Sequence, residues 1–227
     1  MKFNMNFFKH LKTITRHRHR VIHNCYLAGI GFQGLFHDLS KYMPSEFIAG
    51  VTHYQGTRSP NEGEREDYGY SLAWMHHKGR NRHHFEYWTD YDHVTRKISP
   101  VMMPKRFVVE MLCDRIAASQ IYLSDKYNDG EPLAYFIKGS KTRVIHKRTS
   151  AEIELLLRIL ALEGQTEVFA YTKKWLARRS HSLPALSEKE LKNPEIARLA
   201  ESFKRLPRTG MASLSENAAN DNANVSC

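Results

Sequence analysis

The chain has 227 residues, of which 41% are hydrophobic and 26% charged, a balance typical of one globular domain with a substantial core. No apolar run approaches the roughly 18 residues of a membrane helix, and the basic N-terminus lacks the apolar stretch of a secretory signal, so we expect a cytoplasmic protein without a membrane partner. The formal net charge of +10 favours anionic partners such as phosphorylated substrates or nucleic acid, although a solvated basic surface explains it equally well.

Apolar residues recur at helical spacing along most of the chain. They predict helices over about residues 7–28, 34–41, 44–53, 68–79, 104–123, 151–160, 165–179 and 188–205. Pro44 and Pro104 are expected at first helical positions, and Ser150 and Ser187 at helix starts. The segment 55–67, which is punctuated by Pro, Gly and Asn, is predicted to be a loop.

No strand alternation and no internal repeat is apparent in the sequence. Residues 207–227 are small and polar, a composition that cannot bury a core, and are predicted to be disordered. The cysteines are widely spaced and form no CxxC motif, so we expect no disulfide framework and no thiolate zinc site; Cys25 and Cys113 are expected in the core. The sequence therefore predicts a single all-α domain over 1–206 with a tail over 207–227.

Two polar residues lie on predicted apolar helix faces. His17 continues the apolar stripe of the first helix, and Asp114 lies on the apolar face of the helix over 104–123. Burying either group without a partner is costly, so each needs a hydrogen bond, an ion pair or a metal. A hydrogen-bonded core histidine explains His17 alone, and an ion pair with Arg18 or with a neighbour of Arg115 explains Asp114 alone.

The adjacent pair His37-Asp38, in "LFHDLSKYMP", adds two more side chains that bind metals. Such a pair also occurs by chance. Together with His17 and Asp114, however, it provides imidazole and carboxylate groups from three separate predicted helices. This ligand set suits Mn, Fe, Mg, Zn or Ni rather than a purely thiophilic metal. The four residues are therefore candidates for one divalent metal site.

The sequence resembles the HD-domain superfamily of metal-dependent phosphohydrolases, through the histidine on the first helix, "LFHDLSK" and the later "EMLCDRIAAS". Residues 8–125 also resemble a smaller, uncharacterised family of HD-like proteins with phage and bacterial members. The segments that carry this second resemblance are "HDLSKYMPSEF", "YQGTRSP", "HHKGRNRHHFEYW" and "CDRIAAS". The resemblance covers just over half of the chain and implies an HD-like helical bundle.

By this resemblance, His17, His37, Asp38 and Asp114 are the metal ligands. The sequence departs from the superfamily pattern in two ways. Ser40 stands where the superfamily often has a glycine before its lysine, and the spacer before Asp114 is long and rich in histidine.

The long spacer contains two histidine doublets, His76-His77 and His83-His84. Two-metal HD proteins carry two further histidines at this place, so the resemblance implies a second ion, with Asp38 as the bridge between the two. We select His77 and His84 as its ligands and leave His76 and His83 as catalytic proton donors. The alternative is a histidine-rich surface that faces phosphate or nucleic acid.

Three basic residues are candidates for substrate contacts. Lys41 follows the His37-Asp38 pair by one turn, where the lysine of the superfamily contacts a substrate oxygen. Arg58 and Arg80 are candidate phosphate-binding residues, because a guanidinium group matches phosphate oxygens in a bidentate manner. Ordinary surface arginines remain the alternative for both.

The favoured function is hydrolysis of a phosphate ester, a nucleotide or nucleotide derivative, with one or two divalent ions. Two alternatives from other classes remain open. One is an HD-like diiron oxygenase, and the other is a basic helical module that binds nucleic acid without catalysis.

Overall fold

A computed structural model of the chain describes residues 2–206, with side chains from residue 5 onward. Met1 and the predicted tail over 207–227 lie outside the described residues. The described part is mainly helical, as predicted, and contains one short β-hairpin that the sequence analysis did not predict. None of its helices is long and apolar enough to cross a membrane.

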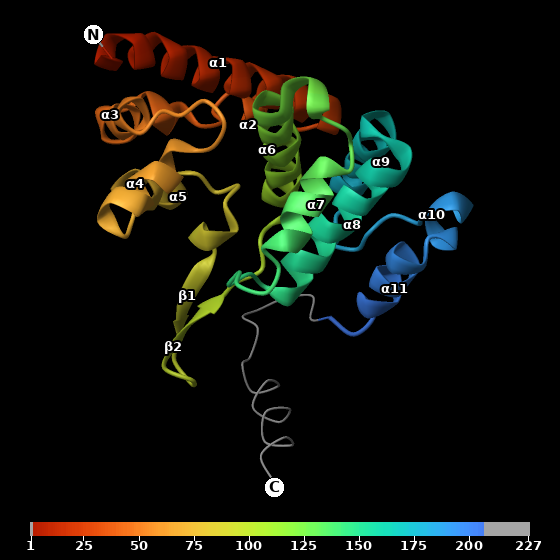
Figure 1. Cartoon of the computed structure of the whole chain (residues 1–227). Coiled ribbons are helices and arrows are strands. Elements are labelled where there is room, and N and C mark those ends of the chain that lie inside the picture. Colours follow the sequence, from red (N-terminus) through yellow and green to blue (C-terminus); the bar gives the residue numbers. More distant parts are fainter. Residues whose placement is uncertain (1, 207–227) are drawn as a thin grey trace, which may run out of the picture.

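Helix α1 (Lys2–Ala28) lies along one side of the molecule and packs mainly against the long helix α6 (Lys105–Leu123) (Figure 1). The buried residues of α1 recur three or four positions apart and are His10, Ile14, His17, Val21, Asn24, Cys25 and Ala28. Asn24 donates a hydrogen bond to the carbonyl oxygen of Cys113 on α6. The predicted apolar stripe is therefore confirmed from Ile14 onward, whereas Phe7 at its start is exposed. Cys25 and Cys113 are free and fully buried, which confirms their place in the core.

The chain between α1 and α3 is more irregular than predicted. A single helix over 34–41 is wrong, because the structure has the short helix α2 (Gly31–Gly34), a turn, and the 3-10 helix η1 (Leu39–Tyr42). The interruption falls at Asp38, which has φ 54° and ψ 26°. This left-handed conformation cannot continue a right-handed helix. Helix α3 (Pro44–Thr52) begins at the predicted proline and confirms the helix over 44–53.

The loop predicted over 55–67 is also wrong in its second half. Helix α4 (Pro60–Tyr68) begins there, with the Ser59 side chain accepting a hydrogen bond from the amide of Asn61. Gly69 ends α4 with φ 79°, so the helix predicted over 68–79 begins later, as α5 (Leu72–Arg80). The glycine and proline of this segment mark helix ends rather than a continuous loop.

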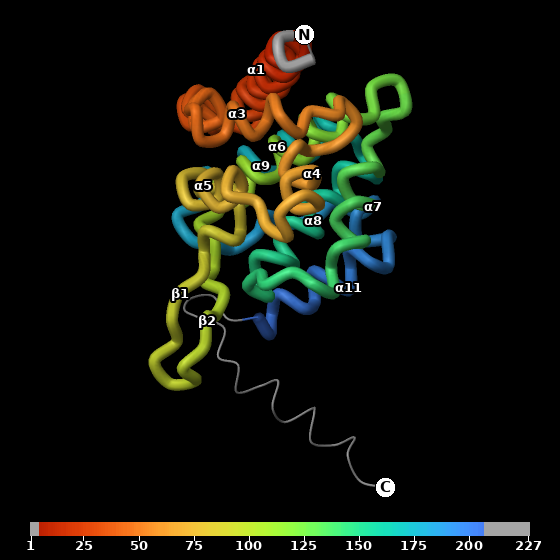
Figure 2. The backbone as a smooth tube through the Cα atoms, turned by 60° about the vertical axis from the view of Figure 1, so that its left-hand side comes forward, coloured from red at the N-terminus to blue at the C-terminus, as the bar shows by residue number. Residues whose placement is uncertain are grey.

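The unpredicted hairpin consists of β1 (Thr89–Asp92) and β2 (Lys97–Pro100), which follow the 3-10 helix η2 (Phe85–Tyr87). The strands are antiparallel and Asp90 pairs with Ser99. Each strand has only four residues, and Tyr91 and Ile98 remain exposed, so neither strand has a clear alternation of apolar and polar residues. The hairpin projects from the helical body (Figures 1 and 2).

The C-terminal half is helical: η3 (Ser124–Lys126), α7 (Glu131–Lys138), α8 (Lys147–Glu163), α9 (Gln165–Ala177), α10 (Glu188–Lys192) and α11 (Pro194–Ser202). Three predicted boundaries here are wrong. Pro104 is the N-cap of α6 rather than its first residue, and His146 rather than Ser150 caps α8. Pro194 divides the helix predicted over 188–205 into two, and Asn193 caps the second part. Helix α7 was not predicted.

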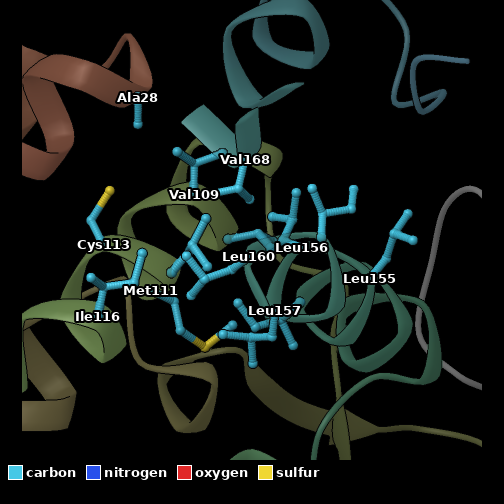
Figure 3. Packing of buried hydrophobic residues seen from close by; sticks show 14 of the residues in the cluster. Ala28, Val109, Met111, Cys113, Ile116, Leu155, Leu156, Leu157, Leu160 and Val168 are labelled. Atoms are coloured by element: carbon cyan, nitrogen blue, oxygen red, sulfur yellow. The ribbon is translucent and has the colours of Figure 1, made fainter. Parts of the chain in front are cut away.

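The hydrophobic core lies mainly between α6, α8 and α9. Figure 3 shows Met111 of α6 beside Leu157 of α8, and all the residues that it labels belong to this core. Because α6 is buried along most of its length, it presents side chains both to this core and to α1 on its other side. Glu110 of α6 is therefore buried and Asp114 half-buried, whereas Arg106 at the start of the helix is exposed.

Candidate metal centre

The turn that carries His37 and Asp38 is held against α1. Arg18 of α1 donates hydrogen bonds to the carbonyl oxygens of His37, at 3.3 Å, and Leu35. Both residues of the pair are buried, with exposed fractions of 1% and 2%. Aspartate is one of the few residues that tolerate the left-handed conformation found at Asp38. The turn therefore directs both side chains inward.

The structure brings together the first predicted group. His17, His37, Asp38 and Asp114 each offer one ligand atom, and these atoms all lie within 4.8 Å of one another. His17 Nε2 is 3.0 Å from Asp114 Oδ1, and His37 Nε2 is 3.3 Å from Asp38 Oδ2 and 3.6 Å from Asp114 Oδ1. The ion pair that the sequence allowed between Arg18 and Asp114 is absent from the described ion pairs, since Arg18 contacts backbone carbonyls instead.

A second group lies on the other side of Asp38 and contains His77, His83 and His84. Their ligand atoms and that of Asp38 again lie within 4.8 Å of one another. His77 Nε2 is 3.3 Å and His83 Nε2 is 3.5 Å from Asp38 Oδ1, and His77 Nε2 is 2.9 Å from His84 Nε2. Asp38 thus presents Oδ2 to the first group and Oδ1 to the second.

Five polar atoms in the two groups are buried without a hydrogen-bond partner among the described residues. They are His17 Nε2, His37 Nε2, His83 Nε2 and both carboxylate oxygens of Asp38. Their contacts are ion pairs with one another, with Asp114 and His77, and with Lys41, whose Nζ is 2.6 Å from Asp38 Oδ2. Unsatisfied buried polar atoms are rare in proteins. Imidazole nitrogens and carboxylate oxygens are also the donors that Mn, Fe, Zn and Ni take, so the residues fit a metal centre.

The electrostatic environment keeps the carboxylates ionised. Burial opposes ionisation of Asp38, but the charges of His37 and Lys41 outweigh it and hold the pKa of Asp38 well below its ordinary value. Burial likewise opposes ionisation of Asp114, but the close contacts with His17 and His37 hold the pKa of Asp114 well below its ordinary value. Ionised carboxylates are the form that binds metal ions.

The histidines of the two groups differ in their environment. Burial favours the neutral form of His37, but the negative charge of Asp38 and hydrogen bonds to carboxylates raise its pKa well above the ordinary value. Burial and the neighbouring histidines hold the pKa of His84 well below its ordinary value. Burial and the charge of Lys41 lower the pKa of His17. His17 and His84 are therefore favoured in the neutral form, which is the form that binds metals.

Glu110 of α6 orients two of the histidines. It accepts a hydrogen bond from His37 Nδ1 at 3.0 Å, and His83 Nδ1 is 3.3 Å from the same oxygen. Gln33 of α2 donates a hydrogen bond to the other oxygen. Burial opposes ionisation of Glu110, yet the contacts with His37 and His83 lower its pKa to about 2. A carboxylate that holds Nδ1 leaves Nε2 directed at the centre, as in many metal sites of proteins.

Glu46 of α3 has the same role for the histidines of α5. It accepts hydrogen bonds from His77 Nδ1, at 2.7 Å, and from His76 Nδ1. His76 Nε2 lies 3.1 Å from Ser45 Oγ, so His76 belongs to neither group. His83, which the sequence analysis left as a proton donor, lies in the second group instead.

The sequence analysis missed both glutamates. Glu110 precedes Asp114 by four positions and so lies on the same face of α6, a spacing that the sequence contains. Glu46 lies in the first turn of α3, where an acidic residue is common for helix stability alone. Spacing could therefore have revealed Glu110, but not Glu46.

A cavity of about 120 Å³ borders the second group. Its walls include Lys41, His77 and His84. The other residues that line it are His10, Thr13, Ile14, Glu46, Gly50, Tyr54, Arg58, Ser59, Pro60, Asn61, Ala73, Trp74 and Tyr122. Arg58 forms a bidentate ion pair with Glu66, at 2.6 and 2.5 Å. Arg80, the second arginine selected from the sequence, is exposed at the end of α5 and does not line the cavity.

Comparison with known protein families finds a match over most of the chain. A model described as "Family of unknown function (DUF5662)" matches residues 6–159, about two thirds of the chain. The matched stretch contains every residue of both groups, together with Glu46 and Glu110. Comparisons with curated proteins and with solved structures find no match.

Proposed function

The chain belongs to DUF5662, a family of unknown function, and we propose that it is an HD-like, metal-dependent phosphohydrolase. The proposed substrate is a phosphorylated small molecule, a nucleotide or nucleotide derivative. The observation that carries the proposal is the set of five buried atoms without a hydrogen-bond partner among the described residues: the two carboxylate oxygens of Asp38 and the Nε2 atoms of His17, His37 and His83 around them. Two ligand groups that share one aspartate are suited to hold two divalent ions.

Bound divalent ions would supply an activated water and stabilise charge on phosphoryl oxygens. In this proposal the first ligand set is His17, His37, Asp38 and Asp114, and the second is Asp38, His77, His83 and His84. His83 acts as a ligand rather than as a proton donor, because its Nδ1 faces Glu110 and its Nε2 faces Asp38.

The cavity beside the second group is the proposed substrate site. At about 120 Å³ it is smaller than the roughly 300 Å³ at which pockets for drug-sized ligands begin, so it would enclose the phosphoryl end of a substrate and leave the remainder at the rim. Lys41 borders both the cavity and Asp38 and would neutralise a phosphate oxygen. Arg58 at the same wall would contact a second oxygen after leaving Glu66.

The test combines metal analysis with a screen for phosphate release. The purified chain is loaded separately with Mn, Fe, Mg, Zn and Ni, and its metal content and its activity on nucleotides and small phosphate monoesters are measured. The variant Asp38→Asn retains a residue that tolerates the left-handed backbone but loses the bridging charge. Asp125→Asn, which changes an exposed aspartate outside the site, is the matched control.

We expect up to two ions per chain and phosphate release in the wild type and in Asp125→Asn. Asp38→Asn should bind neither ion tightly and lose activity by more than about 100-fold, since even the loss of a residue behind a ligand costs 10- to 100-fold. Metal binding without phosphate release from any substrate would refute the hydrolase. Bound iron with an oxygen-dependent change in absorption would instead support the diiron oxygenase.

A further inference from the structure

The outward face of α1 carries a row of basic side chains, which we call the basic ridge: Lys9, Lys12, Arg16 and Arg20. They are three or four positions apart, so they lie above one another on one face of the helix. All four are exposed. At about 1.5 Å per residue, the ridge extends about 16 Å along the helix axis.

The basic ridge has no acidic partner. The sequence contains no aspartate or glutamate before Asp38, so α1 itself carries no negative charge. Within the described part of the chain, no ion pair joins any of the four residues to a carboxylate on another element. Surface lysines and arginines that are not neutralised in this way form a concentrated positive potential, which attracts polyanions.

The ridge leads into an aromatic groove at the C-terminal end of α1. The groove has a volume of about 460 Å³ and is lined by His19, Ile22, His23, Tyr26, Gly31, Phe32 and Leu35. His19 and His23 each follow a ridge arginine by three positions, so the groove continues the same face of the helix. Tyr26 and Phe32 are 73% and 79% exposed, although aromatic rings of this size are usually buried.

We propose that the basic ridge and the aromatic groove together bind single-stranded nucleic acid. Successive phosphates would lie along the ridge, and one or two unpaired bases would stack on Tyr26 and Phe32. A positively charged track beside exposed aromatic rings is the arrangement by which proteins bind single strands without sequence preference. A duplex would use the ridge alone, because its bases are not free to stack.

Two other occupants fit the surface less well. A helix that lies in a membrane surface needs a continuous apolar face, whereas the outward face of α1 is polar between Phe8 and Tyr26, and its aromatic residues line a hollow. A second copy of the chain, docked by the same face, would bring two ridges of like charge together, which is unfavourable.

The surface is separate from the candidate metal centre. His10, Ile14 and His17 lie on the opposite, buried face of α1. In Figures 1 and 2 the other elements lie on one side of α1, so its outward face is uncovered. The inference therefore does not rest on the proposed phosphohydrolase activity and stands or fails without it.

The ridge is tested by measuring the binding of a fluorescent 15-nucleotide thymidine oligonucleotide to the full chain between 50 and 200 mM salt. Four phosphate contacts predict a slope of about −3 in the plot of log affinity against log salt. Lys12→Gln combined with Arg20→Gln should reduce that slope to about half and weaken binding. Lys138→Gln combined with Lys141→Gln removes the same charge from exposed residues near the end of α7. This control should leave the salt slope and the affinity unchanged.

The groove is tested with Phe32→Ala. Because the Phe32 side chain is exposed, its removal leaves the core intact, and circular dichroism checks the fold of the variant. Binding of the single strand should weaken roughly 10-fold, the usual effect of losing one stacked base, and binding of a 15-base-pair duplex should not change. Equal affinity for single strand and duplex, unaffected by Phe32→Ala, would overturn the proposal. So would binding to phosphatidylserine vesicles without binding to the oligonucleotide.

Discussion

Asp38 is the residue on which the candidate centre depends. Asp38 has a left-handed backbone at the end of the turn over 35–38, directly before η1. Its carboxylate therefore projects inward, toward His17 of α1 and His77 of α5. One oxygen faces His37 and the other faces His77 and His83. A glutamate has a longer side chain and could not place its two oxygens at these positions. An alanine would lose both ligands and would also strain the backbone.

The first prediction concerns Glu110, whose carboxylate contacts Nδ1 of His37 and of His83 and forms with these two histidines a third close group. Glu110→Gln keeps the size of the side chain but removes the negative charge that holds Nδ1–H of His37 and His83. Metal affinity should fall by about 10- to 100-fold, the usual effect of losing such a partner. Titration of the chain with Zn or Mn checks this, and saturating metal should restore two ions per chain. An unchanged affinity would contradict the orienting role.

The second prediction concerns His10, which is buried on α1 beside Gly50. Burial, helped by the charge of Lys41, lowers the pKa of His10 from 6.5 to about 4. Between these pH values the unfolded chain binds a proton at His10 that the folded chain does not bind. The free energy of unfolding should therefore decrease as the pH falls through this window, by at most about 3 kcal/mol in total.

Urea unfolding of wild type and His10→Gln at several pH values checks the contribution of His10. A chelator is present throughout, so that metal release does not contribute. Wild type should lose more stability than the variant as the pH falls from 6.5 toward 4, and the two should change in parallel above 6.5. Parallel curves over the whole range would show that His10 is not the source.

At the scale of elements, the turn over 35–38 is positioned by close packing of α2 on α1. A Cβ atom at Gly34 would lie 2.5 Å from Cβ and 3.2 Å from Sγ of Cys25, closer than side chains can approach. Only glycine therefore allows α2 to approach α1 this closely. The Arg18 side chain then fixes the turn by donating hydrogen bonds to the carbonyl oxygens of Leu35 and His37. The position of His37 and Asp38 follows from these two contacts.

The third prediction tests this packing with two glycines. Gly34→Ala should push α2 away from α1, lower the free energy of unfolding by about 1 to 3 kcal/mol and weaken metal binding. Gly79→Ala is the matched control, because a Cβ at Gly79 meets nothing within 4 Å. This second change should stabilise helix α5 by about 0.5 to 1 kcal/mol. Chemical denaturation and metal titration measure both, and an equal effect of the two substitutions would refute the packing argument.

At the scale of the whole molecule, the candidate centre joins segments that are far apart in the sequence. His17 comes from α1, the His37-Asp38 pair from the following turn, His77 from α5, and Asp114 from α6. The elements after α6 contribute no residue to either group in the described part of the chain. The elements after α6 pack against the face of α6 that points to the hydrophobic core. A metal bound on the other face would link α6 to α1 and α5.

The fourth prediction follows from this linkage. Ions that bind the folded chain alone stabilise it by about 2.7 kcal/mol at a free concentration of 100 times Kd, which corresponds to roughly 5 to 10 °C in Tm for a chain of this size. Chelation should lower the Tm of wild type by that amount, and added metal should restore it. Asp38→Asn should show no such difference. If neither chelator nor added metal changes the Tm of the wild type, no metal centre links these helices.

The sequence by itself determined the helical class and four residues that the structure brings together. The periodicity of α1 and α6 was readable because long helices repeat the same face many times. His17 and Asp114 were conspicuous because each interrupts an apolar face and needs a partner when buried. The confirmed place of Cys25 and Cys113 in the core follows from the same periodicity.

Only the tertiary structure decided which histidines of the doublets approach Asp38 and which carboxylates orient them. His83 and His84 follow α5 in a turn, where no helical period relates position in sequence to direction in space. His76 and His77 are adjacent on α5 and both donate a hydrogen bond to Glu46. They differ at Nε2, which approaches Asp38 in His77 and Ser45 in His76. The conformation of Asp38 was equally hidden, because it depends on the packing of α2 on α1. Local sequence specifies helix faces, whereas the direction of a side chain in a turn depends on which distant elements pack around it.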